Sequence, residues 1–192
     1  VKGNPSDPDG GGIAADNSNG VGTVQLGYQA EQWGIAAVYS WLQNPSLLPY
    51  ATAYTNLSYA QENDNIDMSL NAFALSAYWQ PEETGWIPAI SAGWGLNSTN
   101  FNGSDDVPDA FVSTSQSWQV ALHWDDAFIQ GNTAGMAVGQ ATFATALKGG
   151  ETPYDGNYVW EWFYGFQVTD NVTLTPALFY LSRPLGQLSF DG

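Results

Sequence analysis

Apolar side chains alternate with small or polar ones along several stretches of the chain. The clearest stretch lies between Tyr158 and Leu181, where every second residue of the first arm is apolar: Trp160, Trp162, Tyr164, Phe166 and Val168. A period of two is typical of a β-strand with one apolar face. Asp170-Asn171 predicts a tight turn, and the alternation resumes at Val172. We therefore predict a β-hairpin with arms of about ten residues, enough for a tilted strand to cross a bilayer.

The same alternation recurs in three earlier segments and predicts three further hairpins. Their arms are residues 21–30 with 33–41, 68–80 with 87–96, and 116–124 with 133–145. The connections between successive strands are alternately short and long, and the long ones are 43–67, 97–115 and 146–157. Outer-membrane barrels combine short turns at one end with long loops at the other in this way.

The two faces of the predicted strands differ in chemistry. One face is apolar, and its aromatic residues cluster near the predicted strand ends: Trp33, Trp41, Trp79, Trp118, Trp124, Trp160 and Tyr180. Rings in such positions form the interfacial girdles of membrane barrels. The other face carries Ser, Gln, Asn, Ala, Gly and Thr, whereas a soluble sandwich is expected to place charged side chains there. Of the 19 acidic residues, Glu161 alone falls within a predicted strand.

These patterns predict an all-β fold, an antiparallel up-and-down transmembrane β-barrel with about eight strands in this chain. Residues 1–192 are expected to be part of one barrel domain, with a loop at 1–20, four hairpins over 21–182 and a loop at 183–192. Because the chain begins and ends in loop-like sequence, we expect a fragment of a larger barrel of roughly 14 to 18 strands.

Composition removes several classes of function. Charged residues make up 11% of the chain, against about 25% in soluble domains. The net charge of -16 disfavours nucleic acid as a partner. The absence of cysteine excludes disulfides and cysteine-based metal sites. Since the chain has one histidine and no Gly-x-Ser-x-Gly motif, acyl-transfer catalysis has no support, and we expect no enzyme and no cofactor.

The segment 160–184 resembles the carbohydrate-selective porin family, in particular its cyanobacterial branch, also described as iron-uptake porins. The resemblance rests on Glu161-Trp162-Phe163-Tyr164-Gly165-Phe166, Val168-Thr169-Asp170-Asn171-Val172, Thr175-Pro176-Ala177-Leu178-Phe179-Tyr180 and Arg183-Pro184. It implies a bacterial outer-membrane location, contact with outer-membrane lipid, and transport of carbohydrates or ions. In that branch an S-layer-homology domain tethers the barrel to peptidoglycan. No counterpart is expected within these residues, so peptidoglycan is an expected partner of the longer protein alone.

Five residues are candidates for the pore lining: Glu161, His123, Gln119, Gln167 and Arg183. Glu161 either attracts cations and sugar hydroxyls or is paired with a neighbour such as Arg183 or His123. We expect no transition-metal site, because His123 has no second histidine or cysteine to complete one. The acidic loops are expected to form a solvated, charged rim that concentrates cations rather than calcium sites.

The predicted function is passive diffusion of small hydrophilic solutes, sugars or inorganic ions including iron, through a water-filled barrel. Two alternatives remain open: a secreted sugar-binding β-sandwich, and a structural barrel that anchors the envelope with a plugged lumen. A homotrimer suits a porin, although no feature of the sequence reports on assembly.

Overall fold

The computed structural model describes residues 20–45, 48, 50–60, 68–83, 85–101 and 107–186. Within these residues the chain forms one short helix and nine strands. They are β1 (Val21–Gln29), β2 (Trp33–Gln43), α1 (Ala53–Ala60), β3 (Met68–Trp79), β4 (Ala89–Phe101), β5 (Val112–Asp125), β6 (Thr133–Leu147), β7 (Tyr158–Thr169), β8 (Val172–Leu174) and β9 (Ala177–Leu181). Most of the predicted terminal loops, 1–20 and 183–192, lies outside the described residues.

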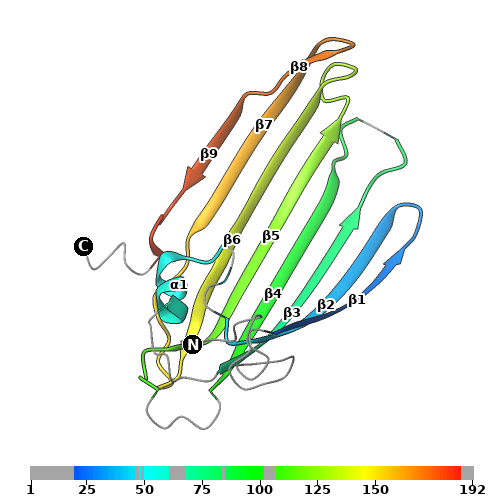
Figure 1. Ribbon diagram of the computed structural model, residues 1–192. Helices are drawn as coiled ribbons and strands as arrows, with labels where there is room; N and C mark the ends of the chain where they lie inside the picture. The colour runs from blue at the N-terminus through cyan, green and yellow to red at the C-terminus, as the bar shows by residue number, and fades with distance from the viewer. Residues whose placement is uncertain are drawn as a thin grey trace, which may run out of the picture.

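All nine strands belong to one antiparallel sheet in which strands adjacent in sequence are adjacent in space. The order is β1-β2-β3-β4-β5-β6-β7-β8. β9 also pairs with β7, along the part of β7 that β8 leaves unpaired. The short turns lie at one end of the sheet, and α1 lies at the opposite end with the longer connections (Figure 1). The prediction of an all-β, up-and-down antiparallel fold is confirmed. The sheet is open, with β1 at one edge and β8 and β9, both paired with β7, at the other.

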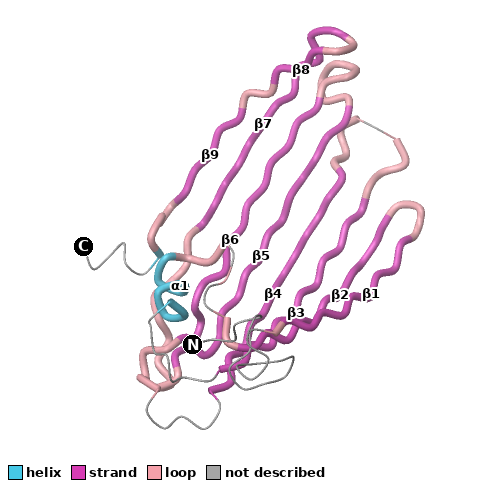
Figure 2. The backbone as a smooth tube through the Cα atoms, viewed as in Figure 1, coloured by secondary structure: helices cyan, strands magenta, loops and turns pink. Residues whose placement is uncertain are grey.

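The last predicted strand is divided into two pieces. The sequence predicts one arm from Val172 to Leu181, whereas the structure has a break at Thr175 and Pro176 between β8 and β9 (Figure 2). Proline has no backbone N–H and cannot donate to the ladder. Its carbonyl still accepts a 3.1 Å hydrogen bond from the backbone nitrogen of Tyr164, so the two pieces continue along one partner strand.

Helix α1 is an element that the sequence analysis did not predict. It lies inside the connection assigned to 43–67 and begins after Thr52. The Thr52 hydroxyl oxygen accepts a 3.1 Å hydrogen bond from the backbone nitrogen of Thr55, which satisfies a helix donor that has no partner within the helix. The helix has eight residues, too few for a periodic signal to stand out in the sequence.

The two clusters of buried apolar residues lie at the α1 end of the sheet. One cluster comprises Leu48, Tyr59, Met68, Leu70, Val107 and Phe111. A second comprises Val112, Ala144 and Leu147, with Tyr54 of α1 packed against it. Elsewhere large apolar side chains are exposed, among them Leu26 at 74% and Leu178 at 67%. So much exposed apolar surface on one sheet indicates that another apolar medium or surface covers it.

Candidate functional site

The strand register sorts the side chains of the sheet into two faces that differ in chemistry. Residues paired directly across antiparallel strands point to the same side. One such row is apolar and runs Ala77, Ala92, Val120, Val138, Trp160, Tyr180. The adjacent row on the opposite face runs Tyr78, Ser91, Ala121, Ala137, Glu161, Phe179. We call these two sides the apolar face and the polar face.

Three polar side-chain donors on the apolar face have acceptors on neighbouring strands. The Trp118 indole nitrogen donates to Gln140 Oε1 at 2.8 Å, and that of Trp94 donates to Gln116 Oε1 at 3.3 Å. The Tyr39 hydroxyl donates to Asn71 Oδ1 at 2.6 Å. Water is absent from a bilayer core, so a lipid-facing surface must satisfy its donors internally. This pairing fits a surface that faces hydrocarbon.

The predicted interface aromatics all lie on the apolar face, but they differ in their place along the strands. Trp33, Trp79 and Trp124 lie at or next to the ends of β2, β3 and β5. Trp118 lies at the middle of β5, because that strand begins at Val112, before the predicted start at 116. Its hydrogen bond to Gln140 supplies, within the sheet, the partner that a headgroup would supply at the interface.

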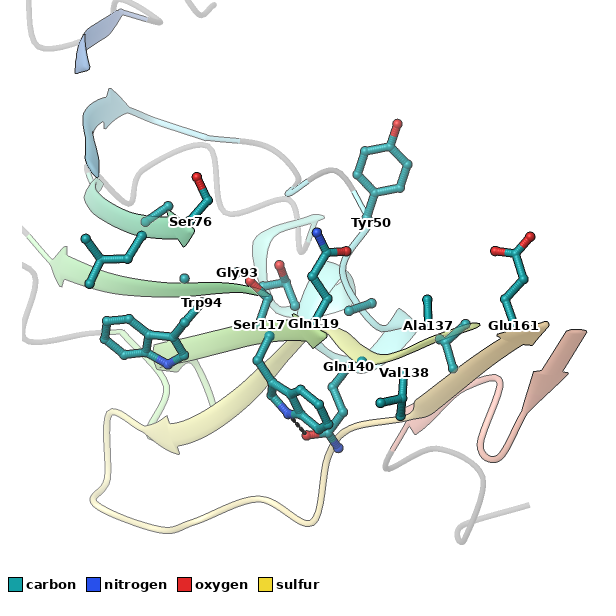
Figure 3. Close-up of a pocket in the computed structure, with 18 residues that line it drawn as sticks. Tyr50, Ser76, Gly93, Trp94, Ser117, Gln119, Ala137, Val138, Gln140 and Glu161 are labelled. Atoms are coloured by element: carbon teal, nitrogen blue, oxygen red, sulfur yellow. Dashed lines mark hydrogen bonds between the residues drawn. The ribbon is translucent and has the colours of Figure 1, made fainter. Parts of the chain in front are cut away.

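The polar face contains a hollow of about 570 Å³ that spans β3 to β7, within the roughly 300–1,000 Å³ of small-molecule sites. Small residues form most of its wall, including Ala74, Ser76, Gly93, Gly95, Ser117, Ala137 and Gly139. Tyr50, Gln119 and Glu161 are its larger polar members. Figure 3 shows these three on one side of the sheet, with Trp94, Val138 and Gln140 on the other.

Glu161 is exposed in this hollow and makes no hydrogen bond or ion pair with the residues that the structure describes. The two partners considered for it are engaged elsewhere. Arg183 donates from Nε to the Gly156 carbonyl and from its terminal nitrogen to the Tyr154 carbonyl, both at 2.8 Å. His123 Nε2 lies 3.1 Å from Asp125 Oδ1.

The structure brings together two of the five predicted pore-lining residues. Gln119 and Glu161 share the hollow. His123 lies near the end of β5 that leads into the 126–132 turn, and Gln167 lies near the same end of the sheet, in β7. The backbone nitrogen of Gln167 donates a 2.9 Å hydrogen bond to Asn132 Oδ1 in that turn. Arg183 lies at the α1 end, where its guanidinium also packs over the Tyr154 ring, 5.3 Å from the centroid.

Asp155 attaches the start of α1 to β6. Its Oδ2 atom accepts hydrogen bonds from the Thr52 and Thr55 hydroxyls at 2.7 and 2.9 Å, and from the Ala144 backbone nitrogen at 2.9 Å. These donors come from both sides of the start of α1 and from β6. Because Arg183 binds the carbonyls on either side of Asp155, it holds this carboxylate in place.

Tyr50 and Asp155 are site residues that sequence reasoning missed. Asp155 appeared as one more acid in a long connection, and Tyr50 stood in a loop between Pro49 and Ala51. The threonines at 52 and 55, spaced three apart, were a signal for a helix start. No sequence signal indicated that the segment folds back over the sheet.

At the α1 end, burial changes the chemistry of one phenol. Burial raises the pKa of Tyr59, and its hydrogen bond with Thr99 opposes that shift. The Tyr59 hydroxyl lies 2.8 Å from Thr99 Oγ1 on β4. The neutral phenol therefore joins α1 to the sheet at ordinary pH.

Among the described residues, no cluster of three or more His, Cys, Asp or Glu side chains is placed to hold a metal ion. Asp105 and Asp106, like the acids of 1–19 and 61–67, lie outside those residues. No helix in the described part of the chain has the length and apolar character needed to span a membrane.

An up-and-down sheet with one apolar face and one small, polar face that bears an uncompensated carboxylate defines the wall of a porin-type β-barrel. The comparisons with known proteins place the chain more narrowly. The family model described as "Carbohydrate-selective porin, OprB family" matches residues 3–191, and the chain belongs to this family. Membership in this family implies an outer-membrane location.

A relative from Synechocystis sp. (strain ATCC 27184 / PCC 6803 / Kazusa), named uncharacterized protein sll0772, is 30% identical over 200 residues. The alignment covers 94% of this chain and 35% of the relative, so the chain spans about a third of that protein's length. This relative fits the cyanobacterial branch that the sequence resembles. No solved structure matches the chain.

Proposed function

We propose that this chain forms part of the wall of an outer-membrane porin through which small hydrophilic solutes diffuse passively. The solutes are sugars and inorganic cations, with iron among the cations that an acidic channel admits. The separation of the two faces over the whole sheet carries the proposal, because it gives lipid and water one surface each. Assembly as a homotrimer stays a prediction.

Planar-bilayer conductance of the complete protein tests the channel. We expect discrete, long-lived open steps. A reconstituted protein that passes no ions would favour the structural barrel with a plugged lumen. A complete protein that is monodisperse in water without detergent would favour the secreted β-sandwich.

The charge of the wall predicts the ion preference of the channel. Glu161 is the exposed carboxylate of the hollow, whereas both described basic residues, Lys148 and Arg183, lie outside its lining. A lumen of this sign concentrates cations. The reversal potential in a KCl gradient should therefore show preference for K⁺, less so in Glu161→Gln and at high salt. Preference for chloride would contradict the argument.

A further inference from the structure

A second hollow, of about 440 Å³, lies on the apolar face at the end of the sheet where the short turns meet. Its floor includes Trp124 and Ala134, which pair across β5 and β6. The apolar pair Leu122 and Met136 lies two residues further along the same strands, so this turn-end hollow continues the apolar face. Its size falls within the range of roughly 300–1,000 Å³ of small-molecule sites.

Two exposed aromatic side chains form the rim of the turn-end hollow. Trp86 of the β3–β4 turn is 84% exposed, and Phe128 of the β5–β6 turn is 77% exposed. Their rings meet edge to face with centroids 5.6 Å apart, and Phe128 also stacks on Tyr164 of β7 with centroids 6.3 Å apart. These contacts order the rings without burying them, so a large apolar surface is left for another group to cover.

The backbone holds this rim in a conformation that is costly. Asp126 has a φ angle of 53° and Phe128 one of 63°, in the left-handed region that bulky residues rarely adopt. The indole nitrogen of Trp124 donates to the Trp86 carbonyl at 3.1 Å, and the Gly131 nitrogen donates to Asp126 Oδ1 at 2.7 Å. Strain that keeps an aromatic ring out of the core points to function rather than stability.

The charge at this end of the sheet selects among ligands. Each of the four short turns contains at least one acid: Glu31, Glu82, Glu83, Asp126 and Asp170. Both basic residues in the described part of the chain, Lys148 and Arg183, lie at the opposite, α1 end. A negatively charged group near the hollow would therefore be repelled, with no base nearby to offset the repulsion.

We propose that the turn-end hollow binds the acyl chain of one bilayer lipid whose headgroup carries no net negative charge. The acyl chain lies on Trp124 and Ala134, against the rings of Trp86 and Phe128, and the headgroup lies beside the acidic turns. A lipid suits the hollow better than a protein does, because the hollow is continuous with the face that lipid covers in a barrel wall. The site goes beyond the proposed channel function, since it needs the membrane location and not conduction.

Native mass spectrometry of the complete protein in detergent measures this binding. Phosphatidylethanolamine or phosphatidylglycerol is added in steps, and the dissociation constant of the first bound lipid is obtained for each. The wild type should bind one phosphatidylethanolamine per copy more tightly than phosphatidylglycerol. Loss of one aromatic contact should raise the dissociation constant of phosphatidylethanolamine in Trp86→Ala and in Phe128→Ala by roughly three- to tenfold.

Three further variants separate the contributions. Ala134→Leu fills the floor of the hollow and leaves the strained turn untouched, and it should weaken binding as Trp86→Ala does. Asp126→Asn retains the Oδ1 acceptor but loses the charge, so the two lipids should bind with more similar affinities. Trp33→Ala is the matched control, because Trp33 is an exposed tryptophan at the same end of the sheet and outside the hollow. It should bind both lipids like the wild type.

The outcomes distinguish a discrete lipid site from general contact with the bilayer. Equal affinity of wild type, Trp86→Ala and Ala134→Leu, or an equal loss in Trp33→Ala, would overturn the proposal, as would tighter binding of phosphatidylglycerol by the wild type. If Trp86→Ala separates an oligomer into monomers and keeps wild-type lipid binding, the hollow is a contact between copies and the lipid proposal is wrong. None of these results bears on conduction, which the bilayer current tests separately.

Discussion

At the scale of single residues, the hydrogen bonds of the apolar face are the detail most specific to a membrane setting. The bond from Trp118 Nε1 to Gln140 Oε1 joins β5 to β6 midway along the sheet. Both side chains belong to a face whose other members are mostly hydrocarbon. In water either group could form a hydrogen bond with solvent. In a bilayer an unpaired group has no such partner, so its desolvation would destabilise the folded protein.

Replacing Gln140 with leucine should therefore destabilise the barrel in lipid vesicles. The indole N–H would lose its acceptor, at a cost of about 1–3 kcal/mol. The urea midpoint of unfolding from vesicles measures this loss. The double variant Trp118→Phe with Gln140→Leu should recover much of it, because neither side chain then needs a partner. Equal midpoints for wild type and the single variant would show that the bond has no such role.

A second residue-scale prediction concerns Tyr59. Its pKa is raised above the usual 10.0 by burial, so the buried phenol is favoured in its neutral form. The resulting stability is complete below pH 10.0 and is lost as the pH rises through the raised pKa. Tyrosinate absorbance of wild type minus Tyr59→Phe should reveal one phenol that titrates above 10.0. A difference curve at or below that value would contradict the burial of Tyr59.

At the scale of elements, Asp155 is the link that attaches the start of α1 to β6. A hydrogen bond to a charged group contributes about 1.5–3 kcal/mol, and Asp155 accepts three from the α1 region and β6. Asp155→Ala should release the start of α1, residues 52–55, from β6, while Ser58 and Tyr59 keep their contacts with the sheet. We expect larger and noisier single-channel conductance.

Asp170→Ala is the matched control, because Asp170 is an acid in the β7–β8 turn at the opposite end of the sheet. It should leave conductance unchanged. If Asp155→Ala conducts like the wild type, the carboxylate does not set the width of the channel.

The strands could be predicted from sequence because each carries its own signal. Aromatic residues at every second position mark β7, and the same period of two marks β3 and the part of β5 near its turn with β6. The start of β5 at Val112 could not be predicted in this way. Near that end the pairing of β5 with β6 is irregular, with register shifts between Val112 and Thr114, between Thr114 and Ser115, and between Gln116 and Trp118. Irregular pairing of this kind breaks the period-two pattern.

The site was less predictable than the strands, because it depends on contacts between segments far apart in the sequence. The placement of Glu161 and Gln119 could be predicted from the alternation of side chains along each strand, because that alternation assigns both residues to the polar face. Tyr50 and Asp155 depend on a loop that folds back over β6, with Thr52 and Asp155 separated by 103 residues. Side-chain periodicity contains no information about such a contact.

At the scale of the whole molecule, apolar side chains are distributed in the reverse of the way found in a soluble domain, where they are buried and polar side chains are exposed. The buried clusters lie at the α1 end, while the long strands expose Leu, Trp, Tyr and Phe over one face. A soluble sheet would need a second layer over that face. A barrel wall needs lipid on it and water on the other side. The assignment of the two faces is therefore the central claim, and the rest of the chemistry depends on it.

Adjacent single-cysteine variants test that assignment most directly. This chain has no cysteine, and Ser76 and Ala77 of β3 are both exposed neighbours on opposite faces. In a cysteine-free form of the complete protein, a charged, membrane-impermeant thiol reagent is applied to open channels in a bilayer. The account predicts rapid modification of Ser76→Cys with a drop in current, and no modification of Ala77→Cys until the membrane is dissolved. Equal reaction at both positions, or reaction of Ala77→Cys alone, would contradict it.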